Sequence, residues 1–117
     1  MRDSEIRERA RALAICIINA CKTMDSRNGV NVLISQVIRS ATSIGANVHE
    51  ANYAASRADF ANKLQIALKE CYETEYWIDL LEAIQAISVE FKEEVLQQSG
   101  TIRRMLVKSI NTVKESL

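Results

Sequence analysis

The sequence predicts an all-α protein, built as an up-down-up-down antiparallel four-helix bundle. Three observations lead to this fold class: the 117-residue chain has no proline, it has only three glycines, and its apolar residues recur at three- and four-residue steps. So few turn-forming residues leave little to connect the strands of a sheet. Hydrophobic residues make up 48% of the chain but aromatic ones only 5%, so aliphatic side chains dominate the expected core. A chain of this length forms one domain, residues 1–117.

The first two helices are predicted over residues 3–24 and 29–54. A turn-forming run, Asp25–Gly29, separates them. The apolar stripe of the first helix comprises Ile6, Ala10, Leu13, Ile17, Cys21 and Met24. The stripe of the second comprises Val30, Leu33, Ile34, Val37, Ala41, Ile44, Val48 and Ala51. Each stripe places its residues on one side of the helix, and this side is expected to face the core.

The third and fourth helices are predicted over residues 57–86 and 89–115. Ser56 has the position of an N-cap, and Asp59 has the position of a capping-box acid three residues later. Ser88 is the expected cap of the fourth helix, because glutamates fill the turns that follow it. The connections between all four helices are short. Short connections imply antiparallel neighbours, and hence the up-down-up-down order.

The second and third helices carry more apolar and small surface than one bundle can bury. In the third helix these residues point around most of the circumference: Tyr72, Tyr76, Trp77, Ile78, Leu80, Leu81, Ala83, Ile84 and Ile87. In the second helix small residues predict close helix packing at Ala41, Gly45 and Ala46. Large exposed apolar patches usually mark a partner, so the sequence predicts a homo-oligomer. A broad but wholly internal apolar face is the alternative.

A polar line follows the opposite face of the second helix. Its members share one side of the helix: Arg39, Ser43, Asn47 and Glu50. If the second and third helices are antiparallel, Arg39 lies within one turn of Glu70 and Glu73. We interpret these six residues as an ion-pair and hydrogen-bond network that fixes the register between helices or subunits. A solvated polar face is the alternative.

The residues of these two helices resemble a known family. The resemblance rests on Arg39-Ser-Ala-Thr-Ser-Ile-Gly-Ala-Asn47, Glu50-Ala51, Ser56-x-x-Asp59-Phe60, Lys63-Leu64-x-Ile66-Ala67-Leu68-Lys69-Glu70 and Glu73-Thr74-x-Tyr76-Trp77. These motifs resemble the four-helix bundle protein family, whose founding members are encoded by intervening sequences inside bacterial 23S rRNA genes. The two outer helices match only by pattern. Many members have proline at the position of Gly45 and glycine at that of Ala51.

The resemblance implies a ring-shaped homopentamer without established catalytic activity. The accessory variability determinant of diversity-generating retroelements is similar in fold. That protein is a basic pentamer that binds nucleic acid and a reverse transcriptase. The present chain has 15 basic and 15 acidic residues, a formal net charge of zero. Any binding to nucleic acid must therefore come from a local basic patch.

Catalytic and metal-binding patterns are not found in the sequence. His49-Glu50 resembles the start of the metalloprotease motif His-Glu-x-x-His, but position 53 is tyrosine and His49 is the only histidine. A zinc site would lack its second imidazole. The chain has no Cys-x-x-Cys pair, no glycine-rich phosphate loop and no Gly-x-Ser-x-Gly elbow. The sequence therefore predicts no enzyme, no metal site and no cofactor.

The cysteines and the apolar runs indicate a cytoplasmic protein. Three cysteines, Cys16, Cys21 and Cys71, fit no disulfide framework and are expected as buried thiols. The N-terminus is too charged for a signal peptide, and its longest apolar stretch, Leu13–Ile18, is too short to cross a bilayer. We therefore expect no membrane partner.

The fourth helix contains the best candidate for contact with nucleic acid. Arg103, Arg104 and Lys108 lie within two turns, and no acidic residue occurs between Thr101 and Lys114. One hypothesis is a patch that contacts RNA and is repeated around a ring. Favourable interaction with the helix dipole on an ordinary solvated face is the alternative. The sequence thus predicts a homo-oligomer associated with RNA or with a nucleic-acid-binding protein; the competing function is a protein scaffold or a reverse-transcriptase accessory factor that binds no nucleic acid.

Overall fold

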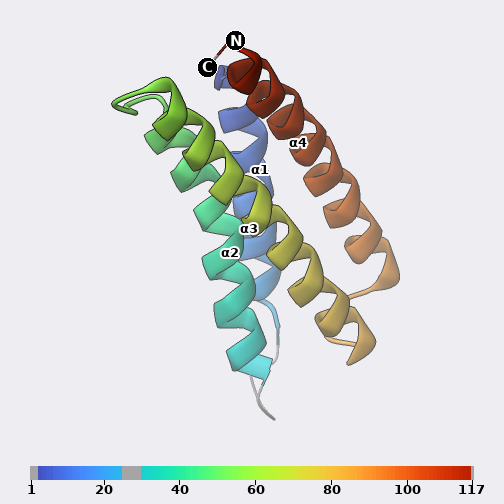
Figure 1. The fold of residues 1–117 in the computed structure, drawn as a ribbon. Helices are drawn as coiled ribbons and strands as arrows, with labels where there is room; N and C mark the ends of the chain where they lie inside the picture. Colours follow the sequence, from blue (N-terminus) through green and yellow to red (C-terminus); the bar gives the residue numbers. More distant parts are fainter. Residues whose placement is uncertain (1–2, 25–29, 117) are drawn as a thin grey trace.

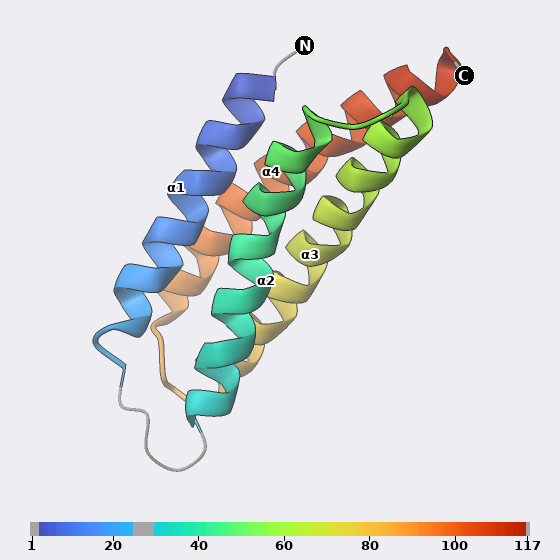
Figure 2. The same cartoon turned by 90° about the vertical axis from the view of Figure 1, so that its left-hand side faces the viewer.

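The computed structural model describes residues 3–24 and 30–116, and within them the chain forms four α-helices (Figure 1). The helices are α1 (Asp3–Cys21), α2 (Val30–Ala51), α3 (Arg57–Ala83) and α4 (Val89–Glu115). Each helix packs against its neighbours in the chain, and α1 also packs against α4, which closes the bundle. Successive helices run in opposite directions, as Figures 1 and 2 show together. The predicted up-down-up-down four-helix bundle is confirmed.

Three helices end about three residues earlier than the apolar pattern predicts: α1 at Cys21, α2 at Ala51 and α3 at Ala83. Beyond each of these ends, at least one amide group bonds to a carbonyl three residues back instead of four. Examples are the amides of Met24 to Cys21 (3.2 Å) and Ala54 to Ala51 (3.1 Å). This tighter turn ends the helix, while apolar side chains continue through it and extend the pattern. The predicted turn over residues 25–29 lies outside the described residues, and so does the predicted first residue of α2.

Serine side chains fix the starts of α3 and α4, as the sequence predicts. Ser56 Oγ accepts a hydrogen bond from the amide of Asp59 (3.1 Å), and the Asp59 carboxylate accepts one from the amide of Ala55 (3.2 Å). Ser88 Oγ accepts from the amide of Phe91 (3.0 Å). Each cap satisfies helix amides that have no partner inside the helix. The two caps therefore set where these helices begin and how short the connections before them can be.

The core is aliphatic, and all four predicted stripes contribute to it. Its largest fully buried side chains are Ile6, Leu13, Ile17, Ile44, Leu64, Ile78, Leu81, Ile102 and Leu106. Two hydroxyl groups are buried between α2 and α3. Thr74 Oγ1 donates to Ser40 Oγ (2.9 Å), and Ser40 Oγ donates to the carbonyl of Val37 (3.2 Å). Because both hydroxyls have partners, burying them costs little, and their bond fixes the relative height of α2 and α3.

The small residues of α2 face α1 at one point. Ala41 is fully buried in the core. At Gly45 an added Cβ would lie 3.6 Å from the Cβ of Ala10, an ordinary van der Waals contact. Ala46 is exposed and lines a shallow depression between α1 and α2. Ala46 therefore makes no close helix contact within the monomer, and the close approach falls on Gly45, with room left for one methyl group.

Replacing Gly45 by alanine should therefore stabilise the protein. The Gly45→Ala variant gains helix propensity and keeps the contact with α1, so its free energy of unfolding should rise by about 0.5–1 kcal/mol. Urea denaturation measures the change. The matched control is Ala46→Gly, one residue along the same helix, which should lose a similar amount. A Gly45→Ala variant that is less stable than the parent would show that the contact between α1 and α2 has no room for a methyl group at position 45.

Candidate nucleic-acid interface

The outer face of α4 carries the three cationic residues that the sequence singles out. Arg103, Arg104 and Lys108 line a shallow depression of about 410 Å³, together with Val107 and Asn111. Arg104 and Lys108 are exposed, whereas Arg103 is half-buried on the side of α3. Arg104 and Lys108 are four residues apart and so share one side of the helix, while Arg103, next to Arg104 in the chain, reaches the depression from the side of α3. The structure thus places all three on one surface.

Residues of α3 and α4 hold Arg103 in place. Its Nε donates to Glu75 Oε2 (2.7 Å), and Ser99 Oγ donates to the same oxygen (2.7 Å). The guanidinium carbon lies 4.9 Å from the centroid of the Tyr72 ring, which is a cation–π contact. The hydrogen bond to Glu75 raises the pKa of Arg103 above its ordinary value. Arg103 therefore keeps its charge, and its position is fixed by a carboxylate that is only 16% exposed.

The guanidinium groups of Arg103 and Arg104 converge over Gly100. A Cβ at Gly100 would lie 3.5 Å from Arg103 Nη2 and 3.4 Å from Arg104 Nη1. Arg104 also donates to Thr101 Oγ1 (3.2 Å). In the described part of the chain, no carboxylate lies within ion-pair distance of Arg104. Glu75 already balances the charge of Arg103, whereas Arg104 has no such partner in the described part of the chain, so an anion placed beside Arg104 gains a favourable interaction. The arrangement suits a phosphate group.

Each carboxylate of α3 has a hydrogen-bond or ion-pair partner within the monomer. Asp59 caps its own helix. The other acids pair with cations from both neighbouring helices: Glu70 (3.5 Å) and Glu73 with Arg39, Glu75 (2.7 Å) with Arg103, and Asp79 (2.7 Å) and Glu82 (3.3 Å) with Lys92. Most of these side chains are partly exposed, so each pair contributes roughly 0–1 kcal/mol to stability. Their larger effect is that they neutralise the acidic residues nearest to the cations of α4.

The predicted polar line of α2 divides into two kinds of residue. Arg39 binds Glu70 and Glu73 of α3, and Glu50 binds Lys63 (3.0 Å). The other two members bond within their own helix instead. Ser43 Oγ donates to the carbonyl of Arg39 (2.7 Å), and Asn47 Nδ2 donates to the carbonyl of Ser43 (2.8 Å). Ion pairs therefore connect the two helices near the middle and near one end, with Ser43 and Asn47 between them outside the network.

Sequence reasoning missed the contacts of three side chains that complete these clusters. Trp77 Nε1 donates to Glu73 Oε2 (3.0 Å), which places the indole beside the Arg39 ion pairs. The spacing of four residues between Glu73 and Trp77 could have indicated this bond. The hydrogen bond from Ser99 to Glu75 joins residues of different helices, so no local sequence pattern could predict it. The sequence pattern placed Tyr72 only among the excess apolar residues of the third helix, whereas in the structure its ring lies against Arg103.

The described residues give little support for a metal site or a membrane-spanning segment. The His49 ring lies 5.5 Å from that of Tyr53. Within residues 3–24 and 30–116, no three His, Cys, Asp or Glu side chains gather as metal ligands would. None of the helices in these ranges combines the length and the hydropathy needed to cross a membrane.

The three cysteine thiols are free; Cys21 and Cys71 are buried in the core as expected, whereas Cys16 is only half-buried. Cys71 is fully buried, and burial raises its pKa to about 12. Burial also raises the pKa of Cys21. A raised pKa keeps these groups protonated at neutral pH, so they behave as small apolar residues.

The buried thiol of Cys71 should make stability fall at alkaline pH. Between its ordinary pKa of 9.0 and its folded value of about 12, the unfolded chain loses a proton that the folded chain retains. The free energy of unfolding should therefore fall by about 1.4 kcal/mol per pH unit in this window because of this group. Urea denaturation of the parent and of Cys71→Ala across the window tests this. The variant should be less stable near neutral pH but lose stability more slowly; parallel curves would contradict the assignment.

Comparisons with known proteins agree with this architecture. Residues 2–108 match the family described as 23S rRNA-intervening sequence protein. The chain is also similar to the crystal structure of a protein of unknown function from the S23 ribosomal protein family of Bacteroides thetaiotaomicron. The two share 42% identity with a TM-score of 0.86, over 95% of this chain and 99% of that one. No curated protein matches the chain. The chain belongs to the 23S rRNA-intervening sequence protein family.

Proposed function

We propose that this protein is a non-enzymatic, ring-like homopentamer of the cytoplasm that associates with RNA through the outer face of α4. The observation that carries the proposal is the convergence of Arg103 and Arg104 over Gly100, with Lys108 beside them. The proposal rests on a local surface, because the whole chain has no net charge.

The helix dipole does not account for this cluster. Its effect is confined to the last turn of a helix, and α4 ends at Glu115. Lys114 lies in that turn, whereas Arg104 and Lys108 lie two to three turns before the end. These two cations therefore gain little from the dipole. A ring would repeat the cluster once per subunit, and weak phosphate contacts on each copy would then act together.

A non-enzymatic role agrees with the state of the reactive side chains. The thiols of Cys21 and Cys71 are buried, and burial raises the pKa of both. A nucleophilic cysteine needs the opposite, an exposed thiol with a lowered pKa. The ion pairs and hydrogen bonds of α3 join it to the neighbouring helices.

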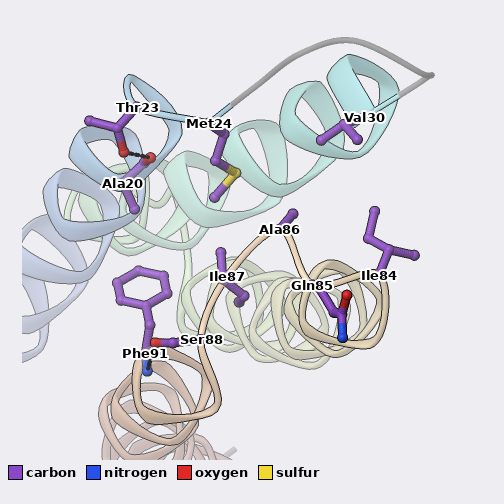
Figure 3. Close-up of a pocket in the computed structure, with 10 residues that line it drawn as sticks. All are labelled: Ala20, Thr23, Met24, Val30, Ile84, Gln85, Ala86, Ile87, Ser88 and Phe91. Atoms are coloured by element: carbon purple, nitrogen blue, oxygen red, sulfur yellow. Dashed lines mark hydrogen bonds between the residues drawn. The ribbon is translucent and has the colours of Figure 1, made fainter.

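Exposed apolar side chains at one end of the bundle support self-association. Ile84 is 52% exposed and Val89 51%, at the two ends of the α3–α4 connection, and Val32 is 63% exposed in the first turn of α2. Figure 3 shows this end, where the end of α1, the start of α2 and the α3–α4 connection surround a hollow of about 640 Å³. Apolar side chains line much of it: Met24, Val30, Ile84, Ala86, Ile87 and Phe91. Contact with another copy would remove this surface from water.

Charged residues at this end should therefore weaken assembly. Light scattering of the parent at micromolar concentration should return the mass of a pentamer. The Ile84→Glu/Val89→Glu variant should shift towards smaller species, because both side chains are half exposed in the monomer and their replacement leaves the core intact. Tyr53→Glu is the control, since Tyr53 is 77% exposed at the opposite end. A monomeric parent would refute the homo-oligomer, and a double variant with the parent's mass would place the interface elsewhere.

The RNA contact is tested by removing Arg104 and Lys108 and keeping the structural Arg103. Fluorescence anisotropy measures the affinity for labelled RNA across a series of KCl concentrations. The Arg104→Gln/Lys108→Gln variant should bind about tenfold more weakly or worse, with a shallower dependence on salt, because fewer counterions are released. The control Arg7→Gln/Arg11→Gln removes the same charge from exposed positions of α1.

Two results would contradict this function. If the parent shows no salt-sensitive RNA binding near physiological ionic strength, the protein is a scaffold or an accessory factor that contacts only protein. If the control loses as much affinity as the α4 variant, the contact depends on overall charge or on the arginines of α1. The comparison of the two variants is valid only if both keep the parent's helical circular dichroism.

A further inference from the structure

We infer that the RNA held by this protein is single-stranded, and that Tyr72 provides the surface on which one of its bases stacks. This inference rests on the proposed function, and it concerns the seam between α3 and α4. Tyr72 is 55% exposed and lies next to Arg103, the innermost cation of the α4 cluster. The seam therefore combines an open aromatic ring with adjacent phosphate-binding cations. This is the combination that single-stranded nucleic acid requires.

The ring is held in place before any ligand arrives. The Arg103 guanidinium lies 4.9 Å from the ring centroid, and Glu75 fixes that guanidinium through a 2.7 Å hydrogen bond. Ser99, which is fully buried, bonds the same carboxylate oxygen. This series of contacts runs from the core to the surface and already restricts the Tyr72 side chain. Stacking a base on Tyr72 therefore costs little further side-chain entropy. An aromatic group prepared in this way favours binding more than a mobile one.

The charges around Tyr72 favour a polyanion. Lys69 is exposed one turn before Tyr72 on α3, and Arg104 and Lys108 lie on the outer face of α4, in the depression that Arg103 also lines. Lys108 lies on the α1 side of that face, where it also lines a hollow with Glu5 and Arg9. Glu75, which binds the same guanidinium as the ring, is neutralised by Arg103. A strand whose base stacks on Tyr72 would therefore place its neighbouring phosphates among cations, with no free carboxylate at hand in the described part of the seam.

A duplex cannot use this surface in the same way. Its bases are already stacked on each other and paired, so no base face is free to meet the Tyr72 ring. A single strand can turn a base outwards, and any base will serve because each has an aromatic face. The exposed Tyr76, one turn further along α3, offers a second ring on the same outer face. The seam should therefore prefer unpaired RNA and show little sequence preference.

The test compares an unstructured RNA of about 12 nucleotides with a duplex of the same length, using the whole protein in its native oligomeric state. Fluorescence anisotropy is measured for the parent, Tyr72→Leu, Tyr72→Phe and the control Tyr53→Leu. The parent should prefer the single strand. Tyr72→Leu should lose roughly tenfold in affinity for it, with an unchanged salt dependence and an unchanged affinity for the duplex. Tyr72→Phe keeps the ring and Tyr53→Leu removes an exposed ring elsewhere, so both should bind as the parent does.

The outcomes separate this inference from the function on which it rests. A parent that binds no RNA refutes both. A parent that binds RNA, but binds the duplex equally well, refutes only the inference, as does a Tyr72→Leu variant with the parent's affinity for the single strand. Light scattering is run on each variant. If Tyr72→Leu dissociates the oligomer, Tyr72 lies between subunits and the inference is wrong.

Discussion

The distribution of charge in this bundle depends on the pairing of the α3 carboxylates with cations from both neighbouring helices. Arg39 of α2 binds two of them, and Arg103 and Lys92 of α4 bind three more. Stability gains little from most of these pairs, because their side chains are partly exposed. The pair between Arg103 and Glu75 is better shielded and has a buried serine as third partner. Without these pairs, α3 would surround the α4 cations with negative charge and oppose any phosphate.

Acidic and basic residues are also segregated along α4. This segregation explains how a chain without net charge can present a basic face. The first turns of α4 hold glutamates, where the helix dipole favours them, and its second half holds the cations. Arg104 and Lys108 are too far from the end of the helix to gain much from the dipole, and their spacing places them on the side away from the core. Net charge describes the whole molecule, whereas a phosphate responds to charges within about a Debye length.

The fold could be predicted from the sequence because it is determined by local patterns. Apolar stripes at three- and four-residue steps gave the four helices, and Ser56 and Ser88 gave two starts. The pattern did not show where helices end, since Met24 continues the apolar spacing through a turn that is no longer α-helical. The closeness of Arg103, Arg104 and Lys108 in the sequence also predicted a cationic cluster on α4. It could not show that Arg103 is held by Glu75 and lies against Tyr72, because these contacts join residues far apart in the chain and depend on the height of α3 relative to α4.

The most direct test of this account is to map where RNA touches the protein. A single-stranded RNA that carries a photoreactive uridine can be crosslinked to the native oligomer, and the modified peptides can be identified by mass spectrometry. The account predicts that the crosslinks fall on the seam between α3 and α4, at Tyr72 and around Arg104 and Lys108, and that they disappear as salt is raised. Crosslinks concentrated on α1 or α2 would contradict it.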